Sequence, residues 1–134
     1  MCIRDRSEGD TYHKGHFDTE LPTVPNNVTL IEGFFDQTLE SFLKQHPHDS
    51  VAFLHIDSDL YSSAIYILRT LNHLIRPGTI IVFDELCDWT GQHIYDFWKE
   101  GEWKALNEWV VEFDREYEPL SRTKEYAAAI KVTK

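Results

Sequence analysis

Two runs of apolar residues, each as long as a β-strand, flank a segment with helical periodicity. The runs are residues 51–56 (VAFLHI) and 79–83 (TIIVF), and apolar side chains recur every three or four positions over residues 62–75 between them. Strand, helix and strand in this order predict a right-handed crossover with the two strands parallel and adjacent. Because both runs are almost wholly apolar, we expect strands that are covered on both faces. Pro77 and Gly78 close the helix.

Weaker patterns precede this unit. Residues 7–27 are polar and contain Gly and Pro, which indicates a loop, and residues 28–31 have the character of a short strand. We expect a helix next, capped by Asp36 or Thr38 and ended by Pro47.

The last third of the chain predicts one helix and two strands. The helix is indicated by four apolar side chains at helical spacing, Trp103, Leu106, Val110 and Phe113. Residues 117–122 and 126–132 read as strands, and Pro119 places the first at a sheet edge because proline cannot donate to a ladder. The alternation of strands and helices predicts an α/β fold.

Composition narrows the range of partners. The formal net charge of −10 leaves no basic surface of the kind that nucleic acid binding requires. No apolar run approaches the roughly 20 residues that cross a membrane. Cys2 and Cys87 offer no disulfide framework, which favours a reducing cytoplasm. We therefore expect a cytoplasmic protein that binds neither nucleic acid nor membrane.

Acidic residues follow both central strands where each ends. Asp57 and Asp59 come after the first strand, and Asp84 and Glu85 come after the second. Carboxyl ends of parallel strands meet at the sheet edge where open α/β sheets bind ligands. Converging carboxylates repel unless a proton or a hard cation offsets their charge, so Asp57, Asp84 and Glu85 can share Mg²⁺ or Ca²⁺. The alternative is that these acids cap helices, and for Asp59 we expect a cap.

Residues 55–63 (HIDSDLYSS) and 77–86 (PGTIIVFDEL) resemble the paired motifs of S-adenosylmethionine-dependent O-methyltransferases of the macrocin O-methyltransferase type. Residues 14–25 (KGHFDTELPTVP) and 27–43 (NVTLIEGFFDQTLESFL) resemble the segments before them, and the resemblance runs from roughly Lys14 to Lys134. It implies a Rossmann-like class I methyltransferase sheet whose last strand is antiparallel. It also implies S-adenosylmethionine and Mg²⁺ as cofactors and a small-molecule hydroxyl as acceptor.

The resemblance also assigns residues to the site. Asp57, Asp84 and Glu85 would bind Mg²⁺, although the family usually has a second aspartate where this chain has Glu85. Asp57 would be the catalytic residue that orients or deprotonates the acceptor hydroxyl. Four residues would contact the cofactor, Gly33, Phe34, Phe35 and Ser58. For the first three the alternative is a tight turn followed by two core aromatics.

One part of the family pattern has no counterpart here. The Gly-rich cofactor loop and its strands do not occur, and residues 1–6 (MCIRDR) resemble a translated sequencing-adapter remnant. We therefore expect residues 7–134 to be a carboxyl-terminal part of a methyltransferase domain that is inactive alone. With two strands lacking, residues 28–31 should collapse onto residues 51–56, or the chain should self-associate at that edge.

Other residues suggest weaker sites. His46 and His48 are expected to be solvated, and His55 to be a core histidine rather than a residue supporting the site. Cys87 has no histidine beside it in the sequence, which argues against a nucleophile. The tryptophans are expected in the core, although Trp89 could border an acceptor pocket.

Two other functions remain open from the sequence. Asp57-Ser58-Asp59 after a buried strand also fits a nucleotide-sugar glycosyltransferase that holds Mn²⁺ and a diphosphate. That interpretation leaves Asp84 and Glu85 unexplained. The other alternative is a non-catalytic fragment that binds neither ligand.

Overall fold

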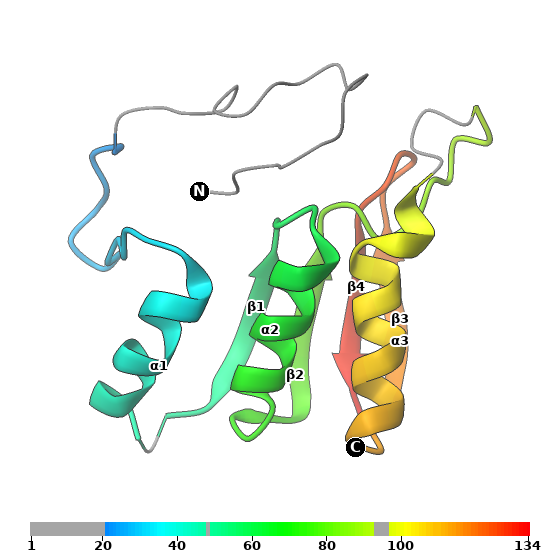
Figure 1. Ribbon diagram of the computed structural model, residues 1–134. Helices are drawn as coiled ribbons and strands as arrows, with labels where there is room; N and C mark the ends of the chain where they lie inside the picture. Colours follow the sequence, from blue (N-terminus) through cyan, green and yellow to red (C-terminus); the bar gives the residue numbers. More distant parts are fainter. Residues whose placement is uncertain (1–20, 48, 93–96) are drawn as a thin grey trace.

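The computed structural model describes residues 21–47, 49–92 and 97–134. The elements follow one another as α1 (Phe35–Gln45), β1 (Val51–Ile56), α2 (Tyr61–Leu71), β2 (Ile75–Phe83), the 3-10 helix η1 (Trp98–Glu100), α3 (Glu102–Glu112), β3 (Tyr117–Arg122) and β4 (Ala128–Val132). Figure 1 traces this order. The adapter-like residues 1–6 lie outside the described residues. None of the helices described is long and apolar enough to cross a membrane.

The strands form one sheet in the order β1-β2-β4-β3. β1 and β2 are parallel, whereas β4 is antiparallel to both of its neighbours. This confirms the parallel pairing of the two central strands, the antiparallel last strand and the edge position of the strand that contains Pro119. The fold is α/β and Rossmann-like.

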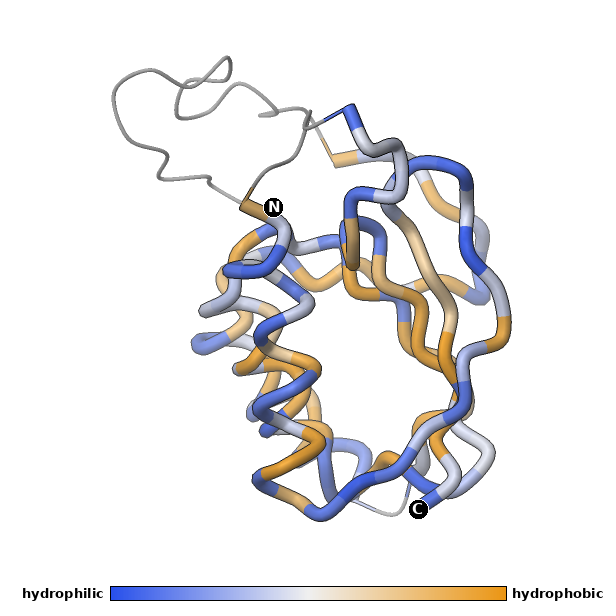
Figure 2. Tube along the Cα trace, turned by 90° about the vertical axis from the view of Figure 1, so that its right-hand side faces the viewer, coloured by the Kyte–Doolittle hydropathy of each residue, from blue (hydrophilic) through white to orange (hydrophobic). Residues whose placement is uncertain are grey.

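The core lies between this sheet and the helices, which Figure 2 shows as two layers. β1 and β2 connect through α2, and α3 packs beside α2. The largest fully buried side chains of this core come from both layers: Trp109, Phe83, Ile56, Leu68, Ile75, Ile81, Leu106 and Ile130. Trp109 buries its indole and still satisfies its N–H, because Nε1 donates to Oδ1 of Asn72 at 3.0 Å.

The expectation that β1 is covered on both faces was wrong. Phe53 is 62% exposed and His55 is exposed as well, while Ile56 is buried. Among the described residues, the helices α2 and α3 lie against one face only (Figure 2), so alternate side chains of β1 face outward. His55 is therefore not the core histidine that we expected.

The predicted strand at residues 28–31 does not form. These residues have no regular structure, and Val28, Leu30 and Ile31 are each more than 40% exposed. A strand needs a neighbouring strand with which to exchange backbone hydrogen bonds. β1 lies at the edge of the described sheet and pairs only with β2. The collapse of this segment onto β1 is thus not observed.

The helix α2 ends earlier than its apolar stripe predicts. It stops at Leu71, and Ile75 begins β2, where it pairs with Val51. The N–H of Val51 donates to the carbonyl of Leu74 at 3.0 Å, which draws this end of β2 into the sheet. The spacing of apolar residues cannot assign a single residue at the boundary between a helix and a strand. The pairing of Ile75 with Val51 therefore decides that it belongs to β2.

The helix caps also differ from the prediction. α1 begins after Phe34, and the Thr38 hydroxyl donates to the Phe34 carbonyl at 2.9 Å instead of capping an N–H. α2 has Leu60 at its N-cap with no side-chain cap, so Asp59 is not the cap that we expected. Asp59 has φ +55°, a left-handed conformation that Asp tolerates in turns.

Candidate functional site

The two predicted groups of acids lie at neighbouring strand ends. Ile56 and Phe83 are partners in the parallel pair, and each is followed directly by an aspartate, Asp57 or Asp84. The N–H of Asp84 donates to the carbonyl of Ile56 at 3.0 Å, so the pairing of the two strands extends to the first acid after β2. The sheet therefore brings the backbone of both acidic segments to one edge.

A buried carboxylate that the sequence analysis missed joins these two segments. Glu102, the first residue of α3, is fully buried. Its Oε1 accepts from the N–H of Ser58 at 3.2 Å, and its Oε2 accepts from the N–H of Glu85 at 3.1 Å. Each donor is the residue that follows an aspartate of the predicted site.

The sequence contains an indication that Glu102 is buried, but the apolar stripe that we predicted for this helix does not include it. The buried stripe of α3 is Glu102, Ala105, Leu106 and Trp109, rotated from the predicted stripe. Glu102 stands at helical spacing from Ala105 and Leu106, so it belongs to the apolar face. A glutamate in the first turn of a helix is ordinarily read as a favourable surface charge, which conceals such a position.

Burial raises the pKa of Glu102 to about 7. Desolvation is the largest cause, and the negative charges of Asp59 and Asp84 add to it. The two backbone N–H donors act in the opposite direction, because they favour the carboxylate. The strand ends are thus an acidic region in which a further negative charge is costly.

The side chains do not form a ready metal site. Within the described ranges, no group of three or more His, Cys, Asp or Glu side chains is arranged to hold a metal ion. The expected convergence of Asp57, Asp84 and Glu85 on one cation is therefore not supported by this arrangement. His55 lies near the acids instead, with Nε2 3.9 Å from Oδ1 of Asp84.

The expected cofactor residues fall into two places. Gly33, Phe34 and Phe35 lie at the amino-terminal end of α1, which points toward the same end of the sheet as the carboxyl ends of β1 and β2 (Figure 1). Gly33 has φ +135°, and a Cβ there would lie 2.6 Å from Cγ2 of Thr38, so the turn itself requires glycine. Phe35 packs against the core, whereas Phe34 is 49% exposed.

Two buried polar atoms lie in the loops that follow β1 and β2. Neither Oγ of Ser58 nor Nε1 of Trp89 has a hydrogen-bond partner among the described residues. Buried polar groups nearly always have a partner, so such atoms are typical of a site that a ligand or ordered water completes. Ser58 is therefore the expected cofactor residue that best fits a polar ligand at the strand ends.

The loop after β2 contributes little nucleophilic chemistry. Burial raises the pKa of the Cys87 thiol, which disfavours the reactive thiolate. A turn follows, because Oδ1 of Asp88 accepts from the backbone N–H of Thr90 at 2.9 Å. His46 pairs with Asp49 at 2.9 Å away from these loops, and His48 lies outside the described residues.

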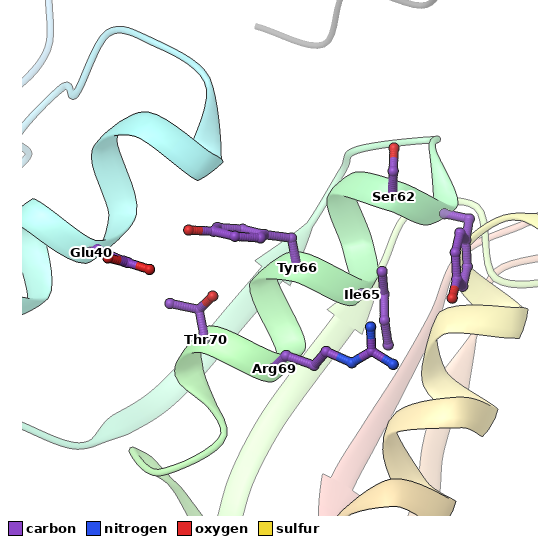
Figure 3. A pocket seen from close by; sticks show the side chains of 7 residues that line it. Glu40, Ser62, Ile65, Tyr66, Arg69 and Thr70 are labelled. Atoms are coloured by element: carbon purple, nitrogen blue, oxygen red, sulfur yellow. The ribbon is translucent and has the colours of Figure 1, made fainter.

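A separate hollow of about 640 Å³ lies along the outer side of α2. Figure 3 shows Glu40 of α1 and Tyr66 of α2 extending toward each other across it. It shares no residue with the predicted site. Its lining is Glu40, Tyr61, Ser62, Ile65, Tyr66, Arg69 and Thr70.

Comparison with known families settles which kind of domain this is. Residues 4–86 match the family profile of a methyltransferase domain, a range that includes α1, β1, α2, β2 and both acidic segments. The chain belongs to this methyltransferase family. The match ends at Leu86, so Glu102 and the two last strands lie beyond it. No curated protein matches the chain closely.

Solved structures agree with the fold of this methyltransferase domain. CalS11, described as a TDP-rhamnose 3′-O-methyltransferase in calicheamicin biosynthesis, superposes with a TM-score of 0.58 at 23% identity over 75% of this chain. The O-methyltransferase NovP superposes with a TM-score of 0.54 at 24% identity over 76% of this chain. The chain spans 40% of the length of CalS11 and 36% of NovP. At this identity the likeness shows the fold alone.

Proposed function

We propose that the protein to which this chain belongs transfers a methyl group from S-adenosylmethionine to a hydroxyl of a sugar or another small metabolite. The observation that carries the proposal is the methyltransferase match over both strand ends. The shared fold with two O-methyltransferases, one of which acts on a TDP-sugar, supports a hydroxyl acceptor. The same match favours methyl transfer over the glycosyltransferase interpretation of Asp57-Ser58-Asp59. The macrocin-type subfamily is part of this proposal, on the motifs at residues 55–63 and 77–86.

The chemistry asks for positioning more than for strong acid–base catalysis. S-adenosylmethionine supplies a methyl group on a sulfonium that is already a good leaving group. An O–C bond forms as the S–C bond breaks, and the hydroxyl proton must leave. Asp57 is the residue we assign to orient that hydroxyl and accept its proton, because it is exposed directly after β1.

We assign the cofactor to the region between the start of α1 and the end of β1. Ser58 offers a buried hydroxyl without a partner among the described residues, and Phe34 offers an exposed aromatic ring. The acceptor would then approach from the loop after β2, where Trp89 lies. We choose this direction because the acceptor hydroxyl must reach Asp57, the residue to which we assign removal of its proton.

Magnesium is proposed separately, and no step above depends on it. The described side chains hold no three-residue cluster, so a cation would rest on fewer carboxylates than we expected. Mg²⁺ often keeps several waters and binds through one or two carboxylates, for which Asp57 and Asp84 are the candidates. Excess chelator tests this part alone: loss of activity that Mg²⁺ restores would support it, and full activity would refute it.

The test of the proposed function is a methyl-transfer assay on the protein that carries this chain. Labelled S-adenosylmethionine would be supplied with a panel of nucleoside diphosphate sugars and small hydroxylated metabolites. Label recovered in an O-methyl product supports the proposal. Transfer only to nitrogen or carbon acceptors, or none to the whole panel, would contradict it.

A further inference from the structure

Glu102 links the two acidic segments in a symmetrical way. Ser58 follows Asp57, Glu85 follows Asp84, and each of these following residues donates its backbone N–H to a different oxygen of the one carboxylate. The separation of the two oxygens is fixed by covalent geometry. The separation of the two backbone segments is therefore held from one side by the β1–β2 ladder and from the other by Glu102.

We propose that Glu102 is a positioning residue that fixes the catalytic Asp57 relative to Asp84 by clamping the backbone after each. The inference rests on the function proposed above, and it concerns a residue outside the range that matches the methyltransferase family. Glu102 does not touch substrate in this proposal. It acts through the main chain of Ser58 and Glu85.

The cost of burying Glu102 argues that the carboxylate has such a role. A buried charge or an imperfectly paired carboxyl is less favourable than an apolar side chain of similar size. The neighbours of Glu102 on the helix face are Ala105, Leu106 and Trp109, all fully buried, so a leucine would suit the stripe. What a leucine cannot do is accept hydrogen bonds from two separate loops.

The clamp is also anchored to the buried core of the fold. Glu102 begins α3, whose Trp109 is fully buried and bonded to Asn72. The amino terminus of a helix favours a negative side chain, which partly offsets the desolvation of the carboxylate. The position of the strand-end loops is thereby tied to the helix layer rather than left to the loops themselves.

Three variants separate positioning from a general structural role. Glu102→Gln keeps one acceptor oxygen, and Glu102→Leu keeps the volume but no acceptor. Glu112→Gln is the matched control, since it removes a carboxylate of the same helix that pairs with Arg69 at 2.7 Å. Kinetic constants are measured in the protein that carries this chain and normalised to the folded fraction from circular dichroism.

We expect kcat per folded molecule to fall about tenfold or more in Glu102→Gln, because displacement of a catalytic group by about an ångström is costly. KM for S-adenosylmethionine should change less than about threefold, because the cofactor is also held at α1. Glu112→Gln should match the wild type in both constants. A Glu102→Gln enzyme with wild-type kcat would overturn the inference, and this variant decides it if Glu102→Leu does not fold.

Amide hydrogen exchange tests the clamp independently of activity. The amides of Ser58 and Glu85 should be protected in the wild type and exchange at least about tenfold faster in Glu102→Leu, or one of them in Glu102→Gln. A wild type that methylates nothing would contradict the proposed function, and exchange would still decide the clamp. Equal exchange rates of both amides in wild type and variants would overturn it.

Discussion

The guanidinium of Arg122 lies over the indole of Trp89, 4.6 Å from the ring centroid. Two backbone hydrogen bonds run beside this contact: the N–H of Trp89 donates to the carbonyl of Glu125 at 2.9 Å, and that of Cys87 donates to Tyr126 at 3.2 Å. The turn between β3 and β4 therefore holds the loop that follows β2. If Trp89 borders the acceptor, this contact controls its position.

Arg122→Ala should raise KM for the acceptor and leave the fold intact. A cation–π contact of this kind is worth about 0.5–1 kcal/mol, which corresponds to roughly two- to fivefold in affinity. Arg122→Lys is the control, because it keeps a cation over the ring. Steady-state kinetics with a saturating methyl donor would measure the change, and an unaltered KM in Arg122→Ala would exclude Trp89 from the acceptor site.

The sequence predicted the central part of the fold because its signals there are local. β1 and β3 have the predicted bounds, and the strand order follows from the crossover rule, Pro119 and the family resemblance. Residues 28–31 failed because strand character is realised only when a ladder partner is present. The exposure of Phe53 could not be read from an apolar run, since the run does not say whether a second layer covers it.

The sequence predicts only those parts of the candidate site whose location follows from their place at the end of a strand. Asp57 and Asp84 follow paired strand residues, so their proximity to one sheet edge follows from topology. Glu102 lies 44 residues after Ser58, and its contacts depend on how α3 docks. No local pattern encodes that docking, and a glutamate on a buried stripe shows itself only once the rotation of the helix is known.

Asp57→Asn should lower methyl transfer by about 10²- to 10⁴-fold, the usual contribution of a general base. The thermal midpoint should change little, because Asp57 is exposed. Asp114→Asn is the control: it removes another exposed aspartate, one that pairs with Lys134 at the far end of α3. Wild-type kcat in Asp57→Asn would remove Asp57 from the chemistry.

Glu102 should make the metal-free protein less stable as the pH rises. Its pKa is raised to about 7 in the folded state, from about 4.5, so the folded state binds the proton more tightly than the unfolded state. The contribution of the protonated Glu102 to the stability of the folded state is therefore complete below about pH 4.5. It is lost as the pH rises through about 7. The full effect is up to roughly 3 kcal/mol for a shift of this size.

The measurement is urea unfolding at pH 5 and pH 8 in the presence of a chelator. As the pH rises from 5 to 8, the unfolding free energy of the wild type should decrease relative to that of Glu102→Gln. Contributions from groups that both proteins share cancel in the difference. A pH-independent difference for Glu102→Gln would contradict the raised pKa.

The edge of β1 should make the isolated chain self-associate. β1 pairs only with β2 in the described sheet, and Phe53 on it is 62% exposed. Unpaired edge strands with apolar side chains recruit other chains, and an added charge opposes this. Sedimentation should show that Phe53→Lys shifts the chain toward monomer, whereas Val111→Lys, at an 81% exposed site on α3, should not. A strictly monomeric wild type would exclude association at this edge.

The isolated chain should bind S-adenosylmethionine only at about millimolar concentration or more weakly. It spans 40% or less of the length of the methyltransferases CalS11 and NovP, and its sequence contains no Gly-rich stretch. The residues that we assign to the cofactor, Gly33 to Phe35 and Ser58, provide contacts from one side only. Each 1.4 kcal/mol of missing contact lowers affinity tenfold, so losing the other side removes several powers of ten. Calorimetry with S-adenosylmethionine and S-adenosylhomocysteine, run beside the protein that carries the chain, measures this, and micromolar binding by the chain alone would show that these residues suffice.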